Sequence, residues 1–169
     1  MNAPMSDRLP LTLIAIKGPS SAKRDRLQFK RGDGSGDDIE MPRQGILPHD
    51  LVHALVEQGF DLVGGFLSMV AAGASPQFLL SKDLPKTAAS GIAESVVEAM
   101  QTQLAQGHFD YEAFLYGAQT ACASRDIDTL PHLDADQAQA IFQQAIALNE
   151  QWRPLKQTDT LTLNVSFKR

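Results

Sequence analysis

The spacing of apolar side chains is strand-like near both ends of the chain and helix-like between them. Two segments, Arg24 to Arg31 and Thr160 to Lys168, alternate strictly between apolar and polar residues, as strands with one buried face do. Leu11 to Ile16 is apolar at most positions, which predicts a strand in the middle of a sheet. The glycine-rich stretch 32–36 predicts a hairpin turn into a short strand near 38–41.

Between these strands, apolar residues recur at intervals of three and four, which predicts about five helices. Because the last strand has no neighbour in sequence, we expect it to return and pair with the N-terminal strands. The predicted fold is α+β in a single domain, 1–169: a small four-stranded, mainly antiparallel sheet packed on about five helices, behind a disordered tail at 1–9. The expected helices cover 48–58, 61–72, 90–106, 111–123 and 134–152.

The amino-acid composition argues for some classes of protein and against others. The 169 residues are 43% hydrophobic and 21% charged, as in an ordinary globular domain, and the net charge of −5 argues against a nucleic-acid partner. No run reaches the roughly 20 apolar residues of a membrane span. A single cysteine, Cys122, cannot form an internal disulfide and suits a reducing compartment. We therefore expect a cytoplasmic protein without a membrane partner.

The first predicted helix carries the residues with candidate chemistry. His49 and His53 are four residues apart and so lie on one face, at the border of the apolar stripe formed by Leu51, Val52 and their successors. Two histidines at this spacing can bind one metal ion, zinc being the usual choice, as in the H-E-x-x-H helix of zinc proteases. The positive end of the helix dipole favours neutral imidazole at His49, the form that binds metal.

The rest of a metal site is less well defined. Glu57, one turn beyond His53, is the candidate third ligand or a supporting group, and His108, Asp110 or His132 could also supply a ligand through tertiary proximity. Asp50 stands where the protease motif has its glutamate base. Because aspartate is one methylene shorter, peptidase chemistry does not follow, and Asp50 is a candidate base, an orienting carboxylate or a helix-stabilising residue.

Two interpretations of this helix stay open, and whether the protein is an enzyme stays open with them. In the first, the helix 49–57 is a structural junction in a domain of unknown role, where it lines a ligand pocket, a partner site or a homo-oligomer surface. In the second, the protein resembles a metal-dependent hydrolase that binds zinc through His49, His53 and Glu57, with Asp50 in the catalytic role. The second interpretation predicts bound metal in the purified protein and the first does not, so measuring the metal content distinguishes them.

The stretch from Pro48 to Ala74 also resembles a family of small uncharacterised bacterial proteins. The shared pattern is a His-Asp-Leu-x-His-x-x-Val-Glu helix behind a short β-meander, followed by a glycine- and aromatic-rich helix. The resemblance covers about the first 75 residues. It draws attention to His49, Asp50, His53 and Glu57, and it implies no activity.

Overall fold

The chain folds into one antiparallel sheet whose central strand is the first in the sequence. The computed structural model describes residues 7–82, 84 and 86–169. Neighbouring strands all pair antiparallel, in the order β3-β2-β1-β4. The predicted return of the last strand to the N-terminal strands is thereby confirmed. The strands are β1 (Arg8–Ile16), β2 (Arg24–Arg31), β3 (Gly36–Pro42) and β4 (Thr160–Lys168).

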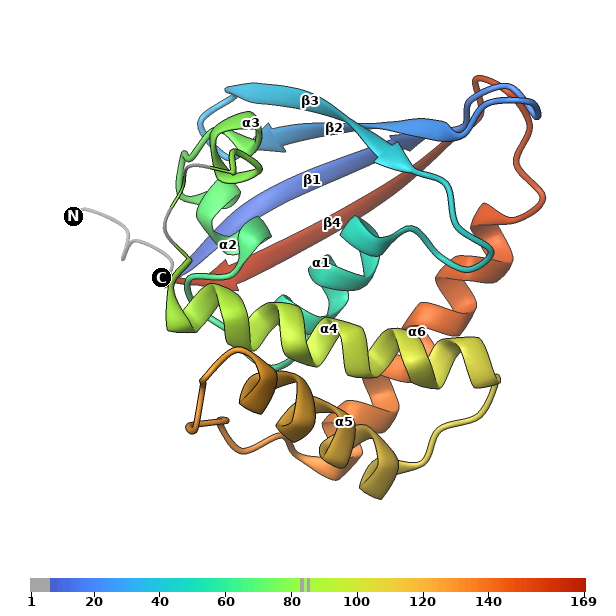
Figure 1. Cartoon of the computed structure of the whole chain (residues 1–169). Coiled ribbons are helices and arrows are strands. Elements are labelled where there is room, and N and C mark those ends of the chain that lie inside the picture. The colour runs from blue at the N-terminus through green and yellow to red at the C-terminus, as the bar shows by residue number, and fades with distance from the viewer. Residues whose placement is uncertain (1–6, 83, 85) are drawn as a thin grey trace.

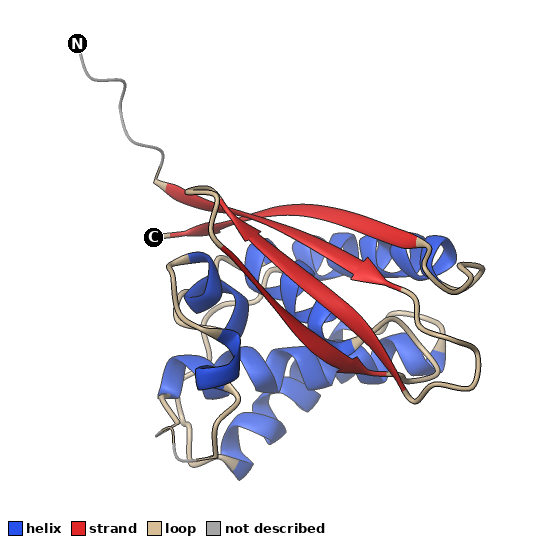
Figure 2. Ribbon diagram, turned by 90° about the horizontal axis from the view of Figure 1, so that it is seen from above, coloured by secondary structure: helices blue, strands red, loops and turns tan. Residues whose placement is uncertain are grey.

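The described residues form six helices, which lie on one face of this sheet (Figures 1 and 2). The predicted α+β architecture is therefore confirmed, with one helix more than expected. α1 packs against β3, β4, α4 and α6, so it lies between the sheet and the outer helices. None of these helices combines the length and apolar character of a bilayer span. They are α1 (His49–Gly59), α2 (Phe66–Ala71), α3 (Pro76–Leu79), α4 (Ala88–Gln106), α5 (Tyr111–Ser124) and α6 (Ala135–Trp152).

The two faces of the sheet differ as the alternating sequence predicts. The face toward the helices is apolar and buried, because every second side chain of a strand points the same way. On the opposite face, Arg24 pairs with Glu40 at 2.8 Å and Arg26 pairs with Asp38. The acidic residues of β3 thus neutralise much of the basic face of β2. The buried apolar residues of the inner face are Leu11, Leu13, Ala15, Leu27, Phe29, Met41, Val165 and Phe167.

Several element boundaries differ from the prediction. β1 begins at Arg8, which pairs with Lys168, so positions 8 and 9 belong to the sheet rather than to a tail, whereas 1–6 lie outside the described residues. Pro48 is the residue before α1 and not its first helical residue. The second helix, expected over 61–72, is only α2, because Asp61 (φ 51°) and Gly64 (φ 83°) have left-handed backbone that a helix cannot contain.

Candidate metal centre

Helix α1 brings the two histidines together at its N-terminal end. Their ring centroids are 4.7 Å apart and the rings meet edge to face. The Nε2 atoms of His49 and His53 are 3.1 Å apart, so both rings direct the same nitrogen at one point. The i, i+4 spacing seen in the sequence therefore becomes a convergent pair of nitrogen atoms.

Glu94, from the middle of α4, completes the group. One of its oxygens, Oε1, lies 2.9 Å from His49 Nε2, and the other, Oε2, lies 2.9 Å from His53 Nε2. α1 and α4 pack directly against each other, which places this carboxylate above the histidine pair. In the described part of the chain, these are the residues whose nitrogen and oxygen atoms are arranged to hold a metal ion.

The second ring nitrogen of each histidine, Nδ1, also has a hydrogen-bond partner. His53 Nδ1 lies 2.9 Å from the Glu57 carboxylate, and His49 Nδ1 lies 2.9 Å from Gln101 Oε1. A histidine that binds a metal through one nitrogen almost always gives its other N–H to a carboxylate or carbonyl oxygen, which sets the tautomer and the ring orientation. Both histidines have such a partner.

One side of the group is open to solvent. The side chain of His53 is 4% exposed, whereas those of His49 and Glu94 are 34% and 36% exposed. His53 is therefore the buried member of the group, and His49 and Glu94 are the members that reach solvent. Three protein ligands with one accessible position characterise catalytic zinc sites, whereas structural zinc sites have four protein ligands.

The two carboxylates and the two imidazoles shift one another's pKa values. Burial alone would lower the pKa of His53, but the hydrogen bonds to Glu57 and Glu94 outweigh it and raise that pKa to about 10. Burial opposes ionisation of Glu94, yet hydrogen bonds with His49 and His53 hold its pKa far below the ordinary value. Burial would also lower the pKa of His49, but the contact with Glu94 outweighs it and the pKa is raised. We expected the helix dipole to favour the neutral imidazole of His49, and the effect of the Glu94 carboxylate on this pKa is larger.

Protons cannot satisfy all three contacts of the two Nε2 atoms at once. If both Nε2 atoms carry hydrogen and bond Glu94, two N–H donors of His49 and His53 lie only 3.1 Å apart. If one of them lacks hydrogen, its lone pair faces a carboxylate oxygen at 2.9 Å. A cation bound by the lone pairs of all three groups would remove both conflicts.

The spacing of the donor atoms also suits such an ion. In a tetrahedral zinc site with bonds near 2.05 Å, neighbouring donor atoms are about 3.3 Å apart. Here the two nitrogens are 3.1 Å apart, each is 2.9 Å from a different oxygen of Glu94, and one ligand atom from each residue can be chosen so that all three lie within 4.8 Å of one another. The types of donor atom and their convergence fit zinc.

Asp50 lies beside this group without joining it. Burial raises the pKa of its half-buried carboxyl, while the charges of His53 and His49 act in the opposite direction and that of Glu94 adds to the rise. Asp50 is therefore within electrostatic range of all three members. It is the residue that the sequence pattern indicated as a candidate base.

The structure brings Glu94, and not Glu57, to the point where His49 Nε2 and His53 Nε2 meet. Glu57, expected as third ligand or supporting group, lies behind His53, and its oxygens contact that ring and two backbone amides, as a supporting group would. Asp110 caps α5, and His108 and His132 are exposed outside the group. Glu94 was not predicted. The sequence holds one indication of its role: Glu94 comes three residues before Val97, which is buried, and so lies at the border of an apolar stripe.

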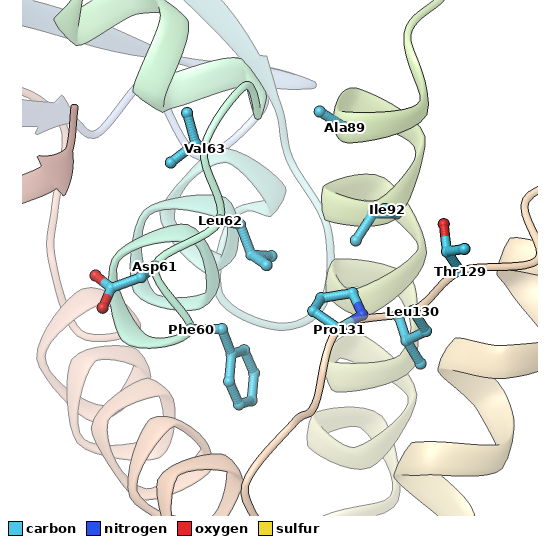
Figure 3. A pocket seen from close by; sticks show the side chains of 9 residues that line it. All are labelled: Phe60, Asp61, Leu62, Val63, Ala89, Ile92, Thr129, Leu130 and Pro131. Carbon is cyan, nitrogen blue, oxygen red and sulfur yellow. The ribbon is translucent and has the colours of Figure 1, made fainter.

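A second feature of the surface lies at the other end of α1. A hollow of about 460 Å³ opens between the turn after α1, the start of α4 and residues 129–131, and Leu62, Ile92 and Pro131 face one another across it (Figure 3). Asp61, at its rim, is paired with Arg8 at 2.8 Å. The walls are mainly apolar, and His49, His53 and Glu94 are not among the lining residues.

Comparison with known proteins adds no assignment: no family model matches the chain, and no curated protein or solved structure is detectably similar to it.

Proposed function

We propose that the protein binds one divalent transition-metal ion, with zinc as the first candidate, through His49 Nε2, His53 Nε2 and the Glu94 carboxylate. The observation that supports this most directly is the convergence of these three groups within 3.1 Å of one another. The outer partners Glu57 and Gln101 give the donor set the second layer that metal-binding histidines require.

We further propose that this site is of the hydrolytic type. A zinc ion with an open position lowers the pKa of bound water to about 7 and polarises a carbonyl group. The chain would hold the ion with His53 as the buried ligand and would leave the side between His49 and Glu94 for a substrate. Asp50 is the residue in this neighbourhood that could orient a water molecule or a substrate group.

The charge around the site favours an uncharged substrate. Three carboxylates, those of Glu94, Glu57 and Asp50, surround the position of the ion and would outweigh its two positive charges. The nearby Arg125 is engaged by both oxygens of Glu98. We therefore expect a neutral ester or amide to be accepted in preference to a phosphate ester, a preference that p-nitrophenyl acetate and p-nitrophenyl phosphate can compare.

A second candidate is a metal-free junction between helices. It is favoured by the burial of His53, which is 3% exposed, and by the fact that every ring nitrogen of the pair has a protein partner. In that case the network would position α1 against α4, and Glu94→Gln would cost stability without changing metal content.

Elemental analysis of the untagged protein tests the proposal. We expect close to one equivalent of zinc or another transition metal in the wild type and its loss in Glu94→Gln. Glu98→Gln is the matched control, since Glu98 is on the same helix and pairs with Arg125 outside the group. Wild-type protein that stays metal-free after dialysis against zinc would rule out the metal site.

A further inference from the structure

Glu57 connects the candidate metal centre to helix α2. Its side chain is completely buried, and one oxygen accepts from both His53 Nδ1 at 2.9 Å and the backbone N–H of Leu67 at 3.2 Å. The other oxygen accepts from the backbone N–H of Ser68 at 3.0 Å. A single carboxylate thus holds the buried ligand on one side and the first turn of α2 on the other.

The backbone just before α2 contacts this carboxylate so closely that a Cβ atom has no room between them. A Cβ atom added at Gly65, the residue before α2, would lie 2.3 Å from Glu57 Oε1 and 2.5 Å from its Cδ. Any side chain at position 65 must therefore move either the Glu57 carboxylate or the start of α2. Glycine at this position is a requirement of the contact.

We infer that Glu57 is a positioning residue through which metal affinity depends on the docking of α2. The inference rests on the proposed metal site. Docked α2 supplies two N–H donors that fix the carboxylate, and the fixed carboxylate orients the His53 ring so that Nε2 points at His49 and Glu94. Because linkage is reciprocal, a bound ion must stabilise the docked position of α2 to the same extent.

Gly65→Ala tests this link without altering a ligand. We expect its zinc affinity, measured by competition with a chromophoric chelator, to fall by about 10- to 100-fold, the usual cost of disturbing an outer partner. Gly45→Ala is the matched control, because an added Cβ meets nothing within 4 Å there, and its affinity should equal that of the wild type. The d–d absorption of the cobalt-loaded protein should change in Gly65→Ala and not in the control.

Hydrogen exchange gives a second test, whose first part uses the wild type alone. The amides of Leu67 and Ser68 donate to Glu57, so zinc should slow their exchange, and Glu57→Gln should remove much of that protection. Unchanged exchange of both amides on zinc binding, or Gly65→Ala with wild-type affinity, would overturn the inference while leaving the metal site standing. Absence of zinc binding by the wild type would instead overturn the proposed function.

Discussion

At the scale of single residues, the Asp25 carboxylate shows how a buried charge is compensated in this protein. Asp25 is 2% exposed and accepts from the Gly18 backbone N–H at 2.8 Å and from Arg43 Nε at 3.2 Å. Burial alone would raise its pKa, but the hydrogen bonds from Arg43 and Gly18 prevail and hold that pKa below the ordinary value. The pair joins β2 to the loop that follows β3.

The lowered pKa of Asp25 predicts a loss of stability in acid. Its stabilisation is fully present above the pKa of an unfolded aspartate, about 3.9, and is lost as the pH falls toward the lower pKa of the folded state. At pH 7 we expect Asp25→Asn to reduce the free energy of unfolding by about 1–3 kcal/mol, because Arg43 loses its charged partner. Urea denaturation at several pH values measures both effects.

The exposed pair of Asp38 and Arg26 provides the control for this experiment. Asp38→Asn should change the stability by less than about 1 kcal/mol at any pH, since exposed ion pairs contribute little. An Asp25→Asn protein with wild-type stability at pH 7 would show that the carboxylate is not needed.

Single residues of the candidate site were predictable to different degrees. His49 and His53 share one helix, so the helical repeat alone brings them together. Glu94 is 41 residues away from His53, and only the packing of α4 on α1 makes them neighbours. The spacing of residues in the sequence cannot reveal that contact, and for the same reason the sequence left Glu57 open between a ligand and a supporting group.

At the scale of elements, helix α2 is held by opposite charges at its two ends. The Glu57 carboxylate meets the amides of its first turn, and Arg31 from β2 donates to the carbonyl oxygens of Val70 and Ala74 at 2.5 and 2.8 Å. A negative group at the start of a helix and a positive group at its end both complement the helix dipole. A six-residue helix thus depends on contacts with α1 and β2.

Arg31→Lys should loosen α2. Lysine keeps the charge but lacks the planar fork that reaches two carbonyl oxygens and Asp37 together. We expect the free energy of unfolding to fall by about 1–3 kcal/mol and the amides of 69–74 to exchange faster. Arg24→Lys, in an exposed pair with Glu40, should change neither quantity measurably. Equal exchange in the two variants would contradict a role for Arg31 at α2.

The elements that were predicted well are those whose pattern is purely local. β2 and β4 have the predicted bounds, because strict alternation identifies a strand with one buried face. Asp110 caps α5 and Gly107 ends α4, as their residue types indicate. The second helix was predicted too long because Leu62 and Val63 suit a helix as well as a turn, and the left-handed backbone at Asp61 and Gly64 decides between them.

At the scale of the whole molecule, stability depends on the packing of β4 against β1 and against the helices. Phe167 in β4 is 1% exposed, so Phe167→Ala should reduce the free energy of unfolding by about 3–5 kcal/mol through lost burial and the cavity left behind. Phe78 in α3 is 61% exposed, and Phe78→Ala should change the free energy of unfolding by no more than about 0.5 kcal/mol. Urea denaturation of the two proteins makes the comparison, and similar costs would mean that β4 is not part of the cooperative core.

The pairing of β1 with β4 also sets the order in which the chain can fold during synthesis. Thr12 in β1 bonds Asn164 in β4 across 152 residues of sequence, and β1 has β2 as its other neighbour. A nascent chain on the ribosome can form the β1–β2–β3 meander early, but one edge of β1 stays unpaired until β4 emerges. Such an edge can pair with other chains. Ribosome-stalled chains should therefore keep bound chaperone unless a C-terminal extension as long as the exit tunnel brings β4, which ends at Lys168, out of the ribosome.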